Sequence, residues 1–250
     1  MQVTNNTYTN YYNQTNNTTK VEKTEESSFA SMLTGSQKED VDEQGRFLQY
    51  MDKYNAFDSL SQADRKVFRE ILKDDKVTMA EIDSLSYNQA EMFLDYVYPP
   101  TNLSKEEFNN APIVNTPTQA NHMLFATRTT NDKTFNEALY RASREIDDDS
   151  YRSKILGQVQ MNIAQVHFGY ELKASFYAGV ETENQWNWDY NNMNINFDNF
   201  LTNVISMHEN EIENPPNNDP DFIKQHQERL DGYNIILKHY NDIKKESIYA

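Results

Sequence analysis

The sequence predicts an all-α protein, and three observations carry that prediction. Apolar side chains recur at intervals of three and four residues along 149–179, the period of one face of an α-helix, and no proline interrupts them. The 250 residues include only 6 Gly and 7 Pro, too few for the tight turns of a β-sandwich. Three segments between Thr78 and Glu107 carry the Ser/Thr-x-x-Glu/Gln pattern of a capping box, which marks a helix start.

Residues 149–179 are predicted to form one long helix around which the rest of the chain is organised. A second line of apolar residues, from Met161 to Phe176, widens the apolar arc, so this helix needs neighbours on more than one side. At about 1.5 Å per residue it is roughly 40 Å long. Gly157 and Gly169 lie inside it, and we expect both to mark the close approach of another helix.

The chain is predicted to divide into four parts of different composition. In order, they are a disordered Asn/Thr-rich leader at 1–28, a small multi-helix subdomain at 29–100, a connector at 101–116 and an antiparallel helical bundle at 117–250. The proline pair at Pro99 ends the last helix of the subdomain. Thr134 is expected to start the helix that precedes the long one.

The leader has an unusual composition. Residues 1–19 contain no charged side chain and consist almost entirely of Asn, Thr, Gln and Tyr, so they offer little apolar area to bury. One interpretation is an ordinary disordered terminus. The other rests on a resemblance: a disordered, uncharged leader rich in Ser, Thr and Asn is similar to the uncleaved export signals of bacterial flagellar and type III secretion substrates. That resemblance implies export without a cleaved signal peptide.

Residues 185–197 are the most unusual internal passage. Trp186, Trp188 and Tyr190 alternate with polar residues before Asn191-Asn192, and Ile195 and Phe197 alternate after it. Two alternating runs around an Asn turn predict a short β-hairpin that gathers these aromatic and aliphatic side chains on one face. The alternative is an irregular loop that runs into a helix starting near Phe197. These five residues are our candidate partner-binding site, because Trp and Tyr dominate binding hot spots; the competing role is to cover the helical core.

Two helices are predicted after this passage. The first begins near Phe197 and ends in the acidic run after His208. The second begins at Pro220, in the first turn, and is capped by Asp219. A short loop joins them, so we expect an antiparallel helical hairpin that packs against the long central helix.

Candidate metal sites are incomplete. Residues 72–85 resemble the second half of an EF-hand calcium loop, but Asp75 stands at the glycine position and the first ligands are missing. His208 and Glu211 share a helix face as in carboxylate-bridged metal sites, yet no facing Glu-x-x-His motif exists, so a solvated helix end is favoured. The aspartates at 147–149 are expected to cap a helix rather than bind a cation.

The sequence offers no catalytic or cofactor motif. It has no cysteine, no glycine-rich phosphate loop and no Gly-x-Ser-x-Gly or His-Glu-x-x-His pattern. His167 and Glu171 are four residues apart in the predicted central helix, which fits a surface hydrogen bond as well as an acid/base pair.

Charge and hydropathy limit the classes of partner. The net charge of -16 opposes binding to nucleic acid or to an anionic membrane surface. No apolar run reaches the ~20 residues of a membrane span, and no signal peptide of the usual type is visible. We therefore expect a cytoplasmic protein, or one exported by a signal-peptide-independent route.

Two functions remain open from the sequence. The favoured hypothesis is a non-enzymatic helical module that binds a protein partner, associated with a flagellar or type III export apparatus. The alternative is an enzyme or metal-binding bundle that uses His208 and neighbouring carboxylates. Bound iron, manganese or zinc in the purified protein would favour the alternative.

Overall fold

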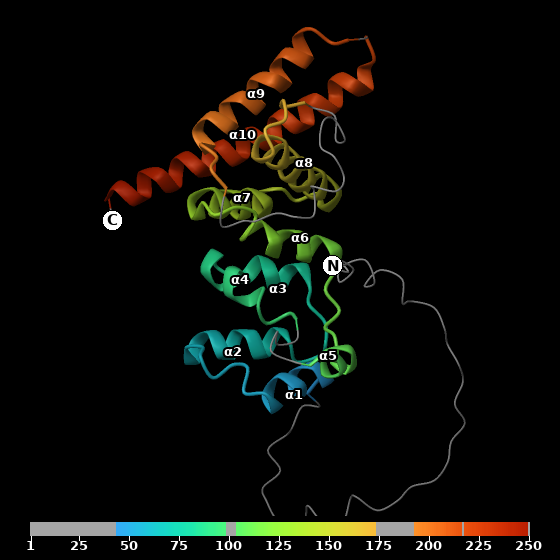
Figure 1. Ribbon diagram of the computed structural model, residues 1–250, viewed down its shortest axis with the longest axis vertical. Coiled ribbons are helices and arrows are strands. Elements are labelled where there is room, and N and C mark those ends of the chain that lie inside the picture. Colours follow the sequence, from blue (N-terminus) through green and yellow to red (C-terminus); the bar gives the residue numbers. More distant parts are fainter. Residues whose placement is uncertain (1–43, 99–103, 174–192, 217, 250) are drawn as a thin grey trace, which may run out of the picture. The chain divides into compact units, whose positions relative to one another are not determined.

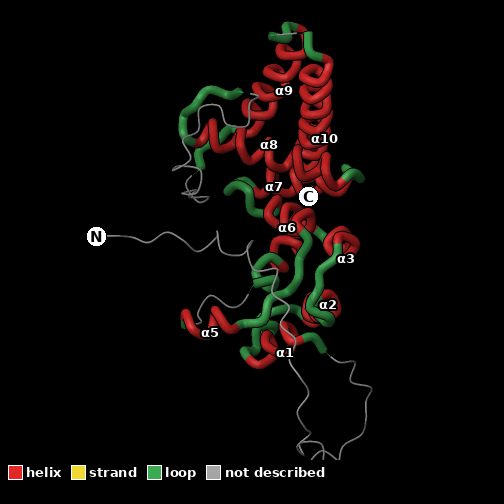
Figure 2. Tube along the Cα trace, turned by 90° about the vertical axis from the view of Figure 1, so that its right-hand side faces the viewer, coloured by secondary structure: helices red, strands yellow, loops and turns green. Residues whose placement is uncertain are grey.

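The computed structural model of the chain describes residues 44–98, 104–173, 193–216 and 218–249 (Figure 1). These residues form ten helices and no strand, which confirms the predicted all-α class (Figure 2). An isolated parallel bridge joins Lys76 to Asn115. The predicted leader at 1–28 lies outside the described residues.

Two groups of helices surround two hydrophobic clusters. The first group is α1 (Arg46–Lys53), α2 (Gln62–Ile71), α3 (Met79–Ser84), α4 (Tyr87–Phe93) and α5 (Lys105–Asn110). The second group is α6 (Thr118–Ala126), α7 (Lys133–Glu145), α8 (Asp149–His167), α9 (Phe197–Glu213) and α10 (Pro220–Tyr249). Helix α6 takes part in both clusters, since Leu124 belongs to the first and Ala126 to the second.

The predicted helix starts are confirmed by hydrogen bonds. Thr78 and Ser86 each form a reciprocal capping box with the residue three positions later, at α3 and α4. Ser104 does the same at α5, where its amide donates to the Glu107 carboxylate at 3.0 Å. Helix α7 begins earlier than predicted, because the Asp132 carboxylate, not Thr134, accepts the amide of Phe135 at 2.9 Å.

The loop between α2 and α3 closes the start of α1. The Asp75 carboxylate accepts the backbone amides of Arg46 and Phe47, both at 2.8 Å, and so caps α1 from a distant part of the chain. The amide of Gly45 donates to the carbonyl of Lys73 at 2.5 Å. Asp75 adopts a positive φ of 60°, a backbone conformation that favours glycine. Its carboxylate is thus used by backbone amides.

The central helix is shorter than predicted, and its end has a clear cause. Helix α8 ends at His167, and Gly169 follows in the left-handed region with φ 73°. The amide of Gly169 donates to the carbonyl of Val166 at 3.1 Å, and that of Tyr170 to Gln165 at 2.7 Å. These two bonds form a Schellman motif, which ends a helix. The prediction that Gly169 lies inside the helix was therefore wrong.

A close helix approach occurs at a glycine of α10. A Cβ atom on Gly232 would lie 2.6 Å from the Cδ1 atom of Ile155 on α8. Only a residue without a side chain lets the backbone of α10 lie this near to the side chain of Ile155. Helix α10 packs mainly along α7 and α9, with α8 as a lesser neighbour, so the predicted α9–α10 hairpin rests largely on α7 (Figure 1).

The described part of the predicted β-hairpin is not a strand. Residues 193–196 have no regular structure, and Phe197 is the first residue of α9. The Asn196 side chain accepts the amide of Asn199 at 2.9 Å, an N-cap that commits the following residues to a helix. Residues 185–192, which include the predicted turn, lie outside the described residues.

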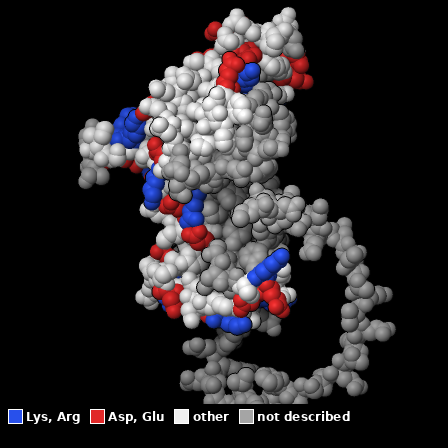
Figure 3. Space-filling view, viewed as in Figure 1, with Lys and Arg blue, Asp and Glu red and all other residues white. Residues whose placement is uncertain are grey.

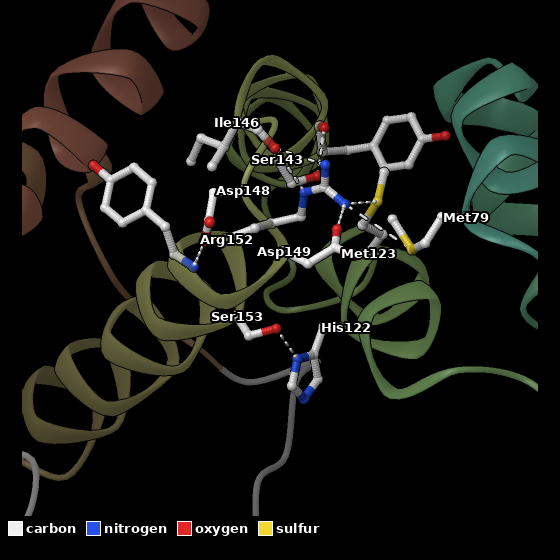
Figure 4. Close-up of polar contacts among 11 residues, drawn as sticks. Met79, His122, Met123, Ser143, Ile146, Asp148, Asp149, Arg152 and Ser153 are labelled. Atoms are coloured by element: carbon white, nitrogen blue, oxygen red, sulfur yellow. Dashed lines mark hydrogen bonds and ion pairs between the residues drawn. The ribbon is translucent and has the colours of Figure 1, made fainter.

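Arg152 stands where the helices of the two clusters meet (Figure 4). Although it is only 4% exposed, its guanidinium donates to the carbonyl of Ile146 at 2.6 Å and to the Asp149 carboxylate at 3.0 Å. The same group lies 3.6 Å from the sulfur of Met123 on α6 and 4.0 Å from that of Met79 on α3. Arg152 thus fixes the corner between α7 and α8, and its guanidinium also faces α6 and α3.

Charged side chains of the described residues are mixed on the face shown in Figure 3. Several link α10 to its neighbours: Arg141 on α7 bonds Glu246 at 3.1 Å, and Lys244 bonds Asp198 on α9 at 2.7 Å. Such exposed pairs contribute little to stability, because water screens the attraction between their charges. No helix among the described residues has the length and apolarity needed to cross a membrane.

The close approach at Gly232 predicts a specific coupling. We expect Gly232→Ala to lower the free energy of unfolding by about 1 kcal/mol, because an overpacking cost of ~1–3 kcal/mol exceeds the ~1 kcal/mol gained in helix propensity. Ile155→Ala removes the three nearest atoms, Cδ1, Cγ1 and Cγ2, so the double variant should lose about 1 kcal/mol less than the sum of the single variants in urea titrations.

Gly169→Ala is the control for this cycle, because its positive φ strains any other residue while no atom lies within 4 Å of its added Cβ. Its effect should simply add to that of Ile155→Ala. Additive effects for Gly232→Ala as well would contradict the close approach.

Candidate functional site

The C-terminal bundle encloses a cluster of polar side chains at the meeting of α8, α9 and α10. Each of its six members is at most 3% exposed. They are Gln158, Asn162, Gln165, His208, His226 and Tyr233. A buried polar group destabilises the fold unless it is hydrogen-bonded, so each of these six side chains is expected to have a hydrogen-bond partner.

Asn162 is the centre of the cluster, and its amide is fully used. Its Oδ1 accepts from the Tyr233 hydroxyl at 2.7 Å and from Gln158 Nε2 at 3.0 Å. Its Nδ2 donates to Gln165 Oε1 at 2.8 Å and to the carbonyl of Lys173 at 3.3 Å. An asparagine has two donors and two acceptor positions, so none is left over. Helices α8 and α10 are thereby joined through one side chain.

The cluster also holds the backbone that follows α8. Besides the bond from Asn162 to the Lys173 carbonyl, the Lys173 amide lies 3.3 Å from Gln165 Oε1, to which it donates. On the other side of residues 174–192, the Asn131 side chain donates to the carbonyl of Met193 at 2.9 Å, and Met193 is itself buried. Both ends of the segment that contains the two tryptophans are therefore fixed to the bundle.

Two histidines complete the cluster. The Nδ1 atoms of His208 and His226 lie 3.3 Å apart, between α9 and α10. The ring of Tyr233 lies against His208 with centroids 5.7 Å apart, and the ring of Phe222 against His226 at 4.2 Å. Burial lowers the pKa of His208 to about 3, with His226 and Arg229 as further causes. Burial, then Arg229, also lowers the pKa of His226.

The tautomers of this pair follow from burial. A neutral pair can share one hydrogen bond between its Nδ1 atoms only if one ring donates and the other accepts. His208 Nε2 is buried and has no partner among the described residues. A buried donor without a partner is the more costly case, so we assign the Nδ1 proton to His208 and the Nε2 proton to His226.

The predicted partner-binding residues fall into two groups. Trp186, Trp188 and Tyr190 lie outside the described residues. Ile195 is half-buried and packs against the second hydrophobic cluster. Phe197 is 2% exposed, and its ring stacks on Phe135 with centroids 4.2 Å apart. The side chain of Phe197 therefore serves the core in this fold.

Sequence reasoning misplaced two of the histidines. His208 is fully buried rather than part of a solvated helix end, because it continues the apolar face formed by Leu201 and Val204. The sequence signal for burial of these two histidines was their spacing, since both His208 and His226 continue the apolar face of their helix. His167 and Glu171 do not form the considered pair: α8 ends between them, and the Glu171 carboxylate lies 3.4 Å from the Lys173 ammonium.

The carboxylates near the histidines do not assemble a metal centre. Among the described residues, no group of three or more His, Cys, Asp or Glu side chains could hold a metal ion. Glu209 is exposed and Glu211 half-buried at the edge of the pair, and the guanidinium of Arg229 faces the histidines as a positive charge. The aspartates at 147–149 act as predicted, with Asp148 accepting the amide of Tyr151 at 2.6 Å.

Comparisons with known proteins give no match to a family model, a curated protein or a solved structure.

The Asn162 network predicts a measurable contribution from one hydroxyl group. Tyr233→Phe should lower the free energy of unfolding by about 0.5–1.5 kcal/mol, the net value of one hydrogen bond. Tyr240→Phe, on the same helix, is the matched control, since the Tyr240 hydroxyl bonds no other described residue. Guanidinium titrations of both variants compare them, and equal losses would contradict the role of the Tyr233–Asn162 bond.

Proposed function

We propose that this chain is a non-enzymatic protein-interaction module, in which the helical bundle presents residues 174–192 to a protein partner. The observation that carries the proposal is the fixing of both ends of this segment. Asn162 and Gln165 bind the backbone of Lys173 from within the core, and Asn131 binds that of Met193. Binding residues are commonly carried by connecting segments that a rigid scaffold positions.

The composition of the segment supports the same use. It contains both tryptophans of the protein, Trp186 and Trp188, followed by Tyr190. Trp and Tyr are the residue types most enriched in binding hot spots, because they bring a large contact area at a low cost in side-chain entropy. With Phe197 committed to the core, the proposed anchors are Trp186, Trp188 and Tyr190.

The leader supports a narrower version of the proposal. Its uncharged, Asn/Thr-rich composition is similar to that of bacterial export signals, which are read in extended form. We therefore place the module with an export or assembly machinery, such as a flagellar or type III apparatus. The proposed association with an export apparatus rests on composition alone, and it can be wrong without affecting the role proposed for residues 174–192.

The role of Trp188 can be tested by separating binding from stability. Trp188→Ala should weaken capture of a partner from an extract of the source cells by about 2 kcal/mol or more, the hot-spot scale, while the melting temperature changes little. Phe197→Ala is the matched control on the core side, because loss of a buried aromatic costs about 3–5 kcal/mol. An early-melting Trp188 variant with unchanged capture would show that Trp188 covers the core instead.

Deletion of residues 2–19 tests the leader independently. The melting temperature of the truncated protein should equal that of the full chain, since an uncharged segment with few apolar residues contributes almost nothing to a core. Its distribution between cell fractions should change, as seen on a fractionation blot. An unchanged distribution would remove the export role and leave the interaction role in place.

A further inference from the structure

The outer part of the α9–α10 hairpin, residues 208–230, packs against the bundle through few buried side chains. We call these residues the hairpin tip. Among its described residues, only His208 and His226 are buried. No apolar side chain of the tip belongs to the second hydrophobic cluster or packs against it, whereas the cluster begins again at Tyr233 on α10 and extends to the half-buried Met207 on α9.

The two histidines are therefore the buried side chains of the tip, which is also joined to α8 by the Tyr151 hydroxyl, donating to the carbonyl of Glu228 at 2.6 Å. Their Nδ1 atoms are 3.3 Å apart across the two helices, and Tyr233, which belongs to the core, lies against His208. Phe222 covers His226 from the tip side. With one proton between the two Nδ1 atoms, the rings attract each other. A further proton on His226 Nδ1 would make two hydrogens face each other, and one on His208 Nε2 would bury a positive charge without a partner.

We propose that the His208–His226 contact is a pH-sensitive switch, which holds the hairpin tip closed at neutral pH and opens it in mild acid while the rest of the bundle stays folded. This inference does not rest on the proposed partner. It rests on the placement of two facing imidazoles as the buried side chains of one cooperative segment, and segments with few buried contacts open before the whole protein unfolds.

The surrounding charges do not compensate a protonated pair. Arg229 of α10 faces both rings and opposes a further positive charge. Glu211 of α9 favours the charged form of His226 alone. Tyr233 of α10 stays neutral, because full burial raises its pKa well above the ordinary value. Helix α8 contributes the uncharged Asn162, which is already saturated by its own hydrogen bonds.

The direction of the pH effect follows from linkage. In the open tip, each histidine is exposed and titrates near pH 6.5. In the closed tip, burial lowers the pKa of His208 to about 3 and lowers that of His226. The open form therefore binds more protons below pH 6.5, so closure is fully favoured above that pH and is lost as the pH falls toward 3. Each pH unit favours opening by up to about tenfold for each histidine.

Hydrogen exchange of the full chain tests the switch. Protection of amides in 208–230, corrected for the intrinsic exchange rate, should fall about 10-fold or more between pH 7 and pH 5, while protection of α7 falls much less. An equal fall in both regions would mean global unfolding and would overturn the proposal. Unchanged protection of the tip at pH 5 would overturn it as well.

Variants identify the titrating groups. The double change His208→Leu and His226→Leu keeps the site apolar and should make protection of the tip independent of pH in this range. His239→Leu, on the same helix but outside the tip, is the control and should keep the wild-type fall. If the double variant does not fold, histidine NMR signals of the wild type decide: His208 titrating near pH 6.5 with the tip still protected would contradict the switch.

Discussion

The buried guanidinium of Arg152 is the interaction on which the joint between the two hydrophobic clusters depends. It satisfies the carbonyl of Ile146 at the end of α7 and the carboxylate of Asp149 in the first turn of α8, so one charged group sets the angle of that corner. It also faces the sulfur atoms of Met123 and Met79 on α6 and α3. A buried charge is tolerated only where partners surround it, so all four elements must keep their places for Arg152 to be accommodated.

The tertiary structure of the second cluster follows from polar as well as apolar contacts. Hydrophobic burial brings α7, α8, α9 and α10 together but leaves their rotation loosely determined. Asn162 is hydrogen-bonded to Tyr233 of α10 and to the backbone at Lys173, and these directional bonds form in only one relative orientation of the groups. Gly232 permits that arrangement by bringing α10 close to Ile155. Burial and specific pairing thus have separate roles in this bundle.

Local features were predictable from the sequence, and features that depend on distant residues were not. The capping boxes at Thr78, Ser86 and Ser104 involve neighbours three positions apart, so their chemistry is visible in the chain itself. The end of α8 at Gly169 was missed because apolar spacing continues past it, although a glycine there also fits a helix end. The contact of His208 with His226 joins two helices. The spacing of apolar residues in the sequence indicates only that each histidine lies on a buried face.

The cap on α1 has a mechanical consequence. The chain enters the described fold at Gly45, whose amide bonds Lys73, and the next two amides bond the Asp75 carboxylate. A pulling force applied to the N-terminus reaches these three hydrogen bonds before it reaches the buried side chains of α1. Their rupture would remove the cap of α1, while the buried side chains of Phe47, Leu48 and Met51 and the ion pair of Asp52 with Arg69 still hold this helix in the first cluster. Among the described residues, a force from the N-terminal side therefore acts first on hydrogen bonds to the α2–α3 loop.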